Sequence, residues 1–349
     1  MSDIDFSEVG SIGLITLSRV QALNALTLPM IMAMQDMLIK WQSKESIHAI
    51  VIQASPGRAF CAGGDIRWLY DAGRQRHEDQ RQFFWHEYRL NHFIHQLNKP
   101  YIALMDGVTM GGGVGISLHG KYPVASERFM FAMPETGIGF FPDIGASHLL
   151  SRCPNHFGTY LGLTGCRVGP YDALSLGLVK HVILAEHFQE VLASLVALDL
   201  SKDAHQQVSS CLQQYQADII DGPLDAIKLS VETCFEGHDM ETIMERLSSR
   251  DDAFHRDTQA LLLQKAPLSL KVTLAQLIKA KTKSLFECLQ MDYCLVGHFM
   301  YGHDFYEGVR AVLVDKDKSP DWQPKSLAQV SDDLVASYFK SSHTDLLEL

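Results

Sequence analysis

Two glycine-rich segments, FCAGGD at residues 60–65 and GGGVG at residues 111–115, decide the fold. In the first segment, consecutive glycines let the backbone turn sharply and approach a ligand closely, and Asp65 is a good N-cap for a helix beginning at Ile66. In the second, three glycines precede a predicted helix, whose free N–H groups and dipole favour negative charge at its N-terminus. An ordinary strand-to-helix turn and close helix packing are the alternative interpretations.

A third segment, MPETGIGFFPD at residues 133–143, places two carboxyl groups, Glu135 and Asp143, in a stretch rich in glycine and proline. That composition is typical of an irregular loop, and catalytic groups are often carried by loops on a rigid scaffold. Asp143 could instead cap a helix formed by GASHLL, and Glu135 could be a solvated loop residue. The segment is therefore a candidate catalytic loop.

The segments lie within an alternating pattern of strands and helices that extends to about residue 198, which predicts an α/β layered core. Short apolar runs predict strands at 12–17, 48–54, 101–105, 129–132 and 181–184, and helical patterns cover 29–42, 66–98 and 113–120. Beyond about residue 200, amphipathic patterns predict helices at 203–217, 223–233, 239–249, 253–264, 268–281 and 284–300. We therefore expect an α/β core over 1–200 and a helical C-terminal region over 201–349, with the boundary near 198–203.

Composition and charge exclude several classes of function. The 349 residues carry a formal charge of −11 and show no basic stripe, so nucleic acid is not an expected partner. No apolar run reaches the roughly 18–20 residues that cross a bilayer, so a membrane is not expected either. The N-terminus is acidic and lacks the features of a signal or transit peptide, which predicts a cytoplasmic protein.

Metal and nucleotide motifs are incomplete. The seven cysteines are odd in number and form no CxxC, which argues against a disulfide framework or a zinc ribbon. HEYRL at 86–90 has Leu90 where a zinc-binding HExxH needs its second His, so no metal site is expected. The GxxxxGK match that begins at Gly115 is followed by Tyr122 instead of Ser or Thr, and GxGxxG does not occur.

In combination, the glycine turn, the glycine-rich helix start and the two-carboxylate loop resemble the crotonase superfamily, also called the enoyl-CoA hydratase/isomerase superfamily. The match is closest to its 3-hydroxyisobutyryl-CoA hydrolase branch. The resemblance covers roughly residues 10–200 and implies a ββα superhelical core, while C-terminal strings resemble the hydrolase branch. The supporting strings are ALNALT (22–27), AFCAGGDI (59–66), TMGGGVGISLHG (109–120), MPETGIGFFPDIG (133–145), TG (164–165), GLVKH (177–181), PLSLKVT (267–273), EGVRAVLVDKDKSP (307–320) and DWQP (321–324).

The resemblance implies an oxyanion hole made by the backbone N–H groups of Gly64 and Gly112. Of the two glutamates that hydratases use as acid and base, one maps onto Glu135 and the other onto Gly115, which has no side chain. This departure counts against hydration of a double bond, which needs both groups. The acidic residues of the hydrolase branch map onto Glu87, Glu135 and Asp143.

The implied reaction is hydrolysis of a short 3-hydroxyacyl-CoA thioester, with a role in valine catabolism. Coenzyme A enters as part of the substrate, and no separate cofactor is expected. Glu135 would attack the acyl group or activate water, Asp143 would orient the substrate hydroxyl or assist proton transfer, and Glu87 would contact the acyl group or support Glu135. A hydratase or isomerase, another acyl-CoA hydrolase and a non-catalytic acyl-CoA-binding protein stay open, and a homo-oligomer is possible.

Overall fold

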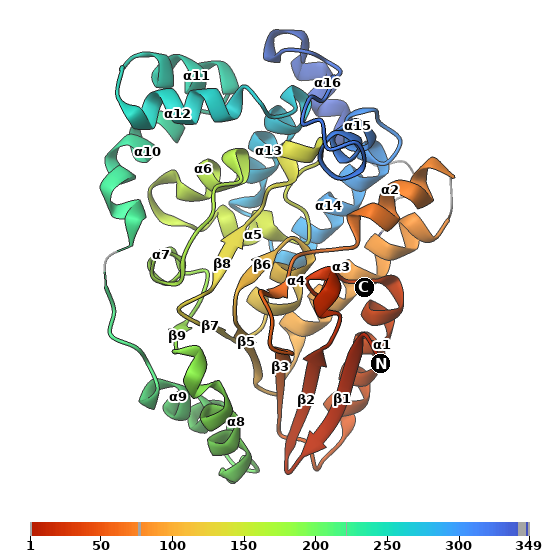
Figure 1. The fold of residues 1–349 in the computed structure, drawn as a ribbon, viewed down its shortest axis with the longest axis vertical. Helices are drawn as coiled ribbons and strands as arrows, with labels where there is room; N and C mark the ends of the chain where they lie inside the picture. Colours follow the sequence, from red (N-terminus) through yellow and green to blue (C-terminus); the bar gives the residue numbers. More distant parts are fainter. Residues whose placement is uncertain (1, 76–77, 221, 341–346, 348–349) are drawn as a thin grey trace. The chain divides into compact units, whose positions relative to one another are not determined.

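The computed structural model describes residues 2–75, 78–220, 222–340 and 347 (Figure 1). The chain forms two compact units. The first unit comprises Met1–Gly64, Arg89–Phe131 and Val168–Gly222. The second comprises Asp65–Tyr88, Ala132–Arg167 and Pro223–Leu349. Each unit is thus assembled from three separate stretches of chain. The boundary expected at 200/201 remains a prediction based on the loss of strand signal.

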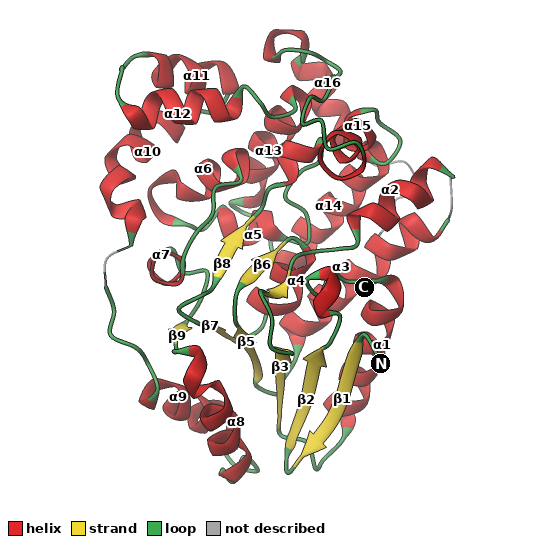
Figure 2. Cartoon of the chain, in the orientation of Figure 1, coloured by secondary structure: helices red, strands yellow, loops and turns green. Residues whose placement is uncertain are grey.

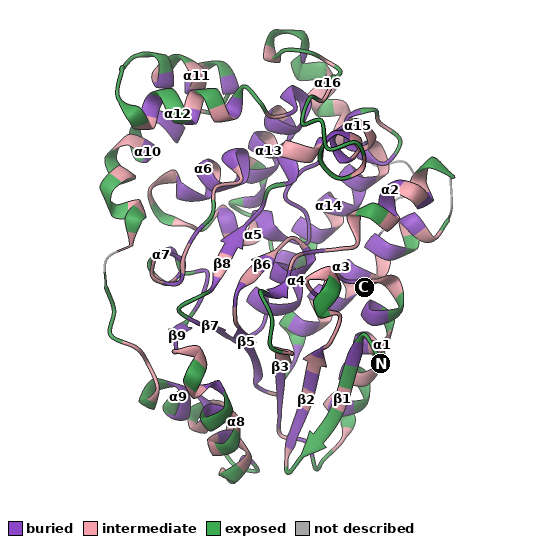
Figure 3. Ribbon diagram, in the orientation of Figure 1, coloured by how far each residue is buried: buried purple, intermediate pink, exposed green. Residues whose placement is uncertain are grey.

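The first unit contains a six-stranded sheet in the order β1-β2-β3-β5-β7-β9. β1 runs antiparallel to β2, and every later pair is parallel. The edge strand β1 is largely exposed, whereas β5 and β7 are buried throughout (Figure 3). Because the inner strands are buried on both faces, their sequences are apolar almost without interruption. The strands are β1 Ile4–Val9, β2 Ile12–Leu17, β3 Ala49–Ala54, β5 Tyr101–Met105, β7 Tyr122–Ala125 and β9 His181–Val182.

Helices cover the two faces of this sheet. On one face, alternate strand residues such as Val51 and Leu104 join the core formed with α8 Phe188–Ala197 and α9 Ala204–Gln214. On the other, Trp41 of α1 Leu28–Ser43 lies so close to Gly13 that a Cβ there would come within 2.6 Å of the indole ring. A glycine is therefore required at this point of β2.

A second, three-stranded sheet in the order β4-β6-β8 positions the glycine-rich segments. Its strands are β4 Ala59–Cys61, β6 Val108–Met110 and β8 Met130–Ala132. The segment at 62–65 follows β4, and the segment at 111–115 follows β6 and opens α4 Gly112–Leu118. Because β4 and β6 are parallel neighbours, both segments leave the same edge of the sheet.

The second unit is mainly helical, and the part of the chain after residue 203 forms helices and loops in the described residues (Figure 2). Asp65 caps the helix that begins at Ile66, as predicted, because its side chain accepts a hydrogen bond from the N–H of Trp68. The helices are α2 Ile66–Arg74, α3 Asp79–Gln96 (which ends in the first unit), α5 Ala146–Leu150, α6 Phe157–Thr164, α10 Lys228–Phe235, α11 Met240–Ser248, α12 Ala253–Leu262, α13 Pro267–Ala280, α14 Leu285–Phe299, α15 Asp304–Val309 and α16 Asp332–Tyr338.

The predicted elements mostly occur within one or two residues of their expected bounds, including α1, α4 and α11 to α14. One prediction is wrong: the helical pattern over 66–98 forms two helices, α2 and α3, and residues 76–77 between them lie outside the described part. Strands β1, β4, β6 and β7 were not predicted, and neither were the helices α6, α7 Pro170–Ser175, α8, α15 and α16, whereas α5 was considered only as the helix that Asp143 could cap. Most of these elements are short, so each carries little periodic signal.

Candidate active site

The two glycine-rich segments pack against each other within the first unit. Gly63 has φ +119° and Gly111 has φ +46°, conformations that residues with a Cβ rarely adopt. A Cβ on Gly63 would lie 3.4 Å from the carbonyl oxygen of Met110. A Cβ on Gly113 would overlap the carbonyl oxygen of Cys61. The glycines therefore allow the backbones of the two segments to approach each other closely. Close packing and ligand binding are both consistent with this approach.

The backbone N–H groups of Gly64 and Gly112 are available as donors. Gly112 is the first residue of α4, so no carbonyl of its own helix lies one turn before it. Within the part of the chain that the structure describes, neither N–H has a hydrogen-bond partner. Buried or half-buried backbone donors are normally paired, so these two are candidates for binding a ligand oxygen.

Asn91 occupies the space beside Gly115. A Cβ at residue 115 would lie 2.7 Å from both the Nδ2 and the Oδ1 of Asn91. Asn91 is fully buried on α3, and both polar atoms of its amide lack partners among the described residues. A side chain at position 115, where hydratases are expected to carry a second glutamate, would collide with this amide.

The three predicted carboxylates are all buried in the second unit. Glu87 is 2% exposed on α3, Asp143 is 6% exposed, and Glu135 is 7% exposed at the start of a 3-10 helix, Glu135–Ile138. The phenol of Tyr88 donates a hydrogen bond of 2.7 Å to Oδ2 of Asp143. The solvated-loop alternative for Glu135 is therefore wrong. Asp143 is also not the cap of α5, because Gly145 occupies that position.

Burial raises the pKa of each carboxyl group because it disfavours the charged form. The pKa values of Glu87 and Glu135 lie well above 4.5, through burial first and the charge of Asp143 second. Burial raises the pKa of Asp143 to about 7, although the hydrogen bond from Tyr88 lowers it. Lys265 counteracts the effect of burial at Glu135. Asp143 thus titrates near neutral pH, beside two carboxyl groups with raised pKa values, and such perturbed groups suit acid–base chemistry.

Two oxygens in this group lack partners among the described residues: Oε1 of Glu87 and Oε2 of Glu135. An unsatisfied buried acceptor costs roughly 1–3 kcal/mol, and more when it is charged. Native proteins keep few such atoms, and those that remain often have a functional reason. Glu87 and Glu135 are therefore the carboxylates best placed to accept a hydrogen bond from a ligand.

Sequence reasoning did not identify four further residues around the carboxylates: Tyr88, Lys265, Gln276 and Asp292. Asp292 is fully buried on α14 and accepts hydrogen bonds from the N–H of Gly145 and from Gln276. One available signal was an acidic residue on the apolar face of the helix predicted at 284–300. Tyr88 follows Glu87 directly, but its role depends on a partner 55 residues away.

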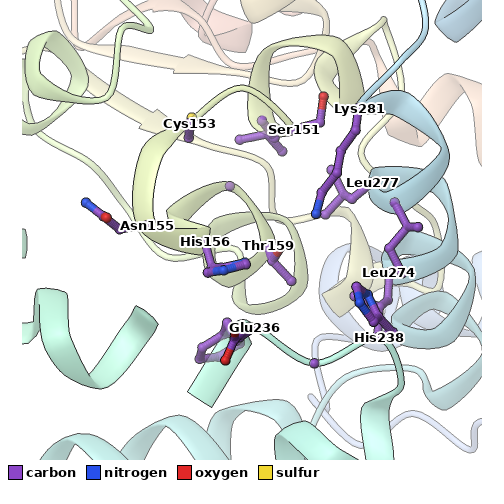
Figure 4. A pocket seen from close by; sticks show the side chains of 15 residues that line it. Ser151, Cys153, Asn155, His156, Thr159, Glu236, His238, Leu274, Leu277 and Lys281 are labelled. Carbon is purple, nitrogen blue, oxygen red and sulfur yellow. The ribbon is translucent and has the colours of Figure 1, made fainter. Parts of the chain in front are cut away.

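A separate cavity in the second unit has a volume of about 180 Å³ and is lined in part by His156, His238 and Lys281 (Figure 4). The described residues that line it do not include Glu87, Glu135 or Asp143. Ligand pockets usually measure roughly 300–1,000 Å³, so this cavity is too small for an acyl-CoA.

The described residues contain no group of three or more His, Cys, Asp or Glu side chains arranged to hold a metal ion. In the same residues, no helix is both long and apolar enough to cross a bilayer.

The fold agrees with the comparisons to known proteins. The Enoyl-CoA hydratase/isomerase family profile matches residues 12–339. The chain belongs to this family, the crotonase superfamily.

Two solved structures superpose with a TM-score of 0.92. They are a carnitinyl-CoA dehydratase from Mycobacterium thermoresistibile, 32% identical over 99% of this chain and 98% of its own, and an enoyl-CoA hydratase from Rhodobacter sphaeroides 2.4.1, 33% identical over 100% of both chains. The predicted crotonase-like α/β fold with a helical C-terminal region is confirmed.

Relatives of known function place the chain within a branch of the family. It is 41% identical to the mitochondrial 3-hydroxyisobutyryl-CoA hydrolase of Rattus norvegicus, over 95% of this chain and 87% of that protein. It is 39% identical to the corresponding Homo sapiens protein, over 95% of this chain and 87% of that protein. These relatives are mitochondrial by name, so the expectation of a cytoplasmic protein is wrong. That expectation rested on features missing from the N-terminus, and such an absence does not identify a compartment.

We expect Gly115→Glu to destabilise the protein without creating a hydratase. The new side chain would overpack against Asn91, which costs roughly 1–3 kcal/mol, and would add another buried carboxyl group. Chemical denaturation measures the first effect, and loss of the conjugated-thioester absorbance of crotonyl-CoA measures the second. Asn91→Ala in the same chain should recover part of the stability, since it removes the colliding amide. Efficient hydration by the single variant would contradict the prediction.

We expect Asp143→Asn to change the pH dependence of stability. The folded state holds the Asp143 proton up to about pH 7, whereas the group's ordinary pKa is 3.8. Its contribution to stability is thus fully present below about pH 4 and is lost as the pH rises through about 7. The variant has no charge to bury, so its Tm relative to the parent should rise between acidic and mildly basic pH. Scanning calorimetry at several pH values measures this difference. A pH-independent difference, equal to that of the exposed control Asp36→Asn, would contradict it.

Proposed function

We propose that this chain hydrolyses 3-hydroxyisobutyryl-CoA, or a closely related short 3-hydroxyacyl-CoA, to the free acid and coenzyme A. The observation that carries the proposal is identity of about 40% over nearly the whole chain with relatives of that name. Three buried carboxyl groups in one unit, Glu87, Glu135 and Asp143, support it. The expected role in valine catabolism is part of the same proposal.

Gly64 and Gly112 are our choice for stabilising the thioester oxygen. The carbonyl oxygen becomes negative when the acyl carbon turns tetrahedral, and backbone N–H groups stabilise this charge. Losing one such donor typically costs roughly 2.7–4 kcal/mol of transition-state stabilisation. The absence of other partners for both N–H groups among the described residues supports this role.

Glu135 is our choice for the carboxylate that starts the reaction. As a nucleophile it would form a mixed anhydride with the acyl group and release the thiolate of coenzyme A, and water would then open the anhydride. As a general base it would deprotonate a water molecule that attacks the same carbon. Both routes need the ionised form, which burial and the charge of Asp143 disfavour by raising the pKa of Glu135, while Lys265 partly opposes this shift. The unpartnered Oε2 of Glu135 is consistent with either route.

Asp143 and Glu87 are assigned to the polar part of the acyl group and to proton transfer. Asp143, with a pKa of about 7, can exist in both protonation states near neutral pH. It can therefore accept a hydrogen bond from a substrate hydroxyl when ionised, or donate a proton toward the leaving thiol when protonated. Glu87 has an unpartnered oxygen for the acyl group or for support of Glu135. The proposed partner is the acyl-CoA substrate, coenzyme A is part of it, and a homo-oligomer remains a prediction.

Hydration or dehydration of an acyl-CoA is the second candidate, because the two structural neighbours at TM-score 0.92 carry the names of a dehydratase and a hydratase. Against it, Gly115 lacks the second carboxylate and Asn91 fills the adjacent space. A free-thiol assay with 3-hydroxyacyl-CoA and an absorbance assay with enoyl-CoA separate the two activities. A non-catalytic acyl-CoA-binding protein would give neither signal while still binding coenzyme A.

We expect Glu135→Gln to abolish thiol release while the fold and the affinity for coenzyme A stay nearly unchanged. The amide keeps the shape of the side chain but provides neither nucleophile nor base. Thiol release, Tm and calorimetric binding of coenzyme A measure the three effects, with the exposed Glu45→Gln as a matched control. Activity within about threefold of the parent would refute the assignment of Glu135.

We expect 3-hydroxyisobutyryl-CoA to be hydrolysed at least roughly a hundredfold faster, by kcat/KM, than isobutyryl-CoA. A site built to bind a hydroxyl rejects an analogue without it by up to about 10⁴-fold, although solvation of the site reduces this ratio. Asp143→Ala should lower both the rate and the ratio. Equal kcat/KM values for the two thioesters would remove the hydroxyl-binding role and favour a general short-chain thioesterase.

A further inference from the structure

The loop that carries Asp143 has an unusual backbone. Ile144 has φ +54° and Gly145 has φ +72°, and residues 142–145 are buried. A left-handed conformation is strained for a β-branched residue, and it persists only where the surroundings hold it in place. The turn at Ile144 directly follows the catalytic candidate Asp143, so whatever holds this turn also sets the direction of the Asp143 side chain.

Two side chains from helices distant in sequence hold this loop on both sides of Asp143. Oδ2 of Asp292, on α14, accepts a hydrogen bond of 2.7 Å from the N–H of Gly145. Its Oδ1 accepts one of 2.7 Å from Nε2 of Gln276, on α13. The same Nε2 donates a second hydrogen bond, of 2.9 Å, to the carbonyl oxygen of Pro142. The loop is thus fixed at the residue before Asp143 and at the second residue after it.

We propose that Asp292 and Gln276 are positioning residues for the reaction, which hold the strained turn at 144–145 and thereby aim Asp143. This inference rests on the proposed function, since it assumes that Asp143 faces the substrate. The bond from Tyr88 to Asp143 depends on the same loop geometry, because its length of 2.7 Å allows little displacement. A shift of about 1 Å in a catalytic group can reduce a rate by about a hundredfold.

The geometry explains why a carboxyl group occupies position 292. Both of its oxygens accept from N–H donors, and neither donor belongs to a charged group. An asparagine would present its NH₂ group to one of these two donors, so one hydrogen bond would be lost. Burying a carboxyl group costs free energy because the charged form loses its hydration. Burial therefore raises the pKa of Asp292 well above 3.8, and the charge of Asp143 raises it further. A carboxyl group at this position fits a site that needs two acceptors in one place.

The experiment compares Asp292→Asn, Gln276→Met, the double variant and the parent, with Thr273→Val as the control. Thr273 is buried on α13 one turn before Gln276, and its hydroxyl lacks a hydrogen-bond partner among the described residues. The measurements are kcat and KM with 3-hydroxyisobutyryl-CoA, the kcat/KM ratio to isobutyryl-CoA, Tm, and hydrogen exchange of the Gly145 amide. Hydrogen exchange at Gly145 can be measured whether or not the protein is active.

For Asp292→Asn we expect kcat to fall roughly 10- to 100-fold with KM within about threefold, a smaller hydroxyl preference, and faster exchange at Gly145. Gln276→Met should show the same changes to a smaller extent. The double variant should be close to Asp292→Asn, because residues in one hydrogen-bond network are not additive. Thr273→Val should leave all of these quantities near the parent values.

Unchanged kcat and unchanged exchange at Gly145 in a folded Asp292→Asn variant would overturn the inference. So would an equal fall in kcat for the control, because it would indicate a general packing effect. If Asp292→Asn does not fold, Gln276→Met decides by the same criteria. If the parent releases no thiol from any 3-hydroxyacyl-CoA, the proposed function fails, whereas exchange at Gly145 still tests whether Asp292 and Gln276 hold the loop.

Discussion

Burial of several carboxyl groups within one unit is the constraint on which the rest of the second unit depends. Each group loses its hydration, which raises its pKa, and each ionised neighbour makes the next ionisation harder. Glu135 is relieved by one cation, Lys265, and Asp143 by the phenol of Tyr88. The protons of such a group belong to the set rather than to single residues. Asp143, with a pKa of about 7, therefore lies beside carboxyl groups whose pKa values are also raised, an arrangement that the proposed reaction would use.

Hydrogen bonding divides these acids into two kinds. Asp292 has both oxygens occupied by N–H donors, and Asp143 accepts from Tyr88. Glu87 and Glu135 each keep an oxygen without a partner among the described residues. Since unsatisfied buried acceptors are costly, the occupied acids fit a supporting role and the unoccupied ones fit contact with a substrate. The unpartnered oxygens that lower the stability of the folded protein are thus the same atoms that the proposed reaction uses.

The sequence predicted most of the long elements because their apolar period is strong: α1 and α11 to α14 match their expected ranges closely. Short elements such as β4 and β6 were missed, although they determine where the glycine-rich segments lie. A three-residue strand contains too few residues to show a period. The single helix predicted over 66–98 failed for the opposite reason, since helical periodicity on both sides concealed the break between α2 and α3.

Some candidate site residues lie in recognisable segments, whereas Glu87, in a helical pattern, was predicted through the family resemblance alone. Glu135 and Asp143 share one loop, and their order after the glycine segments identifies them. Asp292 meets the Asp143 loop across 147 residues of sequence, so no local pattern relates the two. A buried acid in a helix of apolar residues is nonetheless a signal, because its burial needs compensation by specific partners. Asp292 accepts a hydrogen bond from the backbone N–H of Gly145, and this N–H follows a residue, Ile144, in the left-handed conformation. Candidate catalytic side chains can therefore be inferred from sequence more readily than candidate positioning residues, whose identity depends on a backbone conformation that the fold creates.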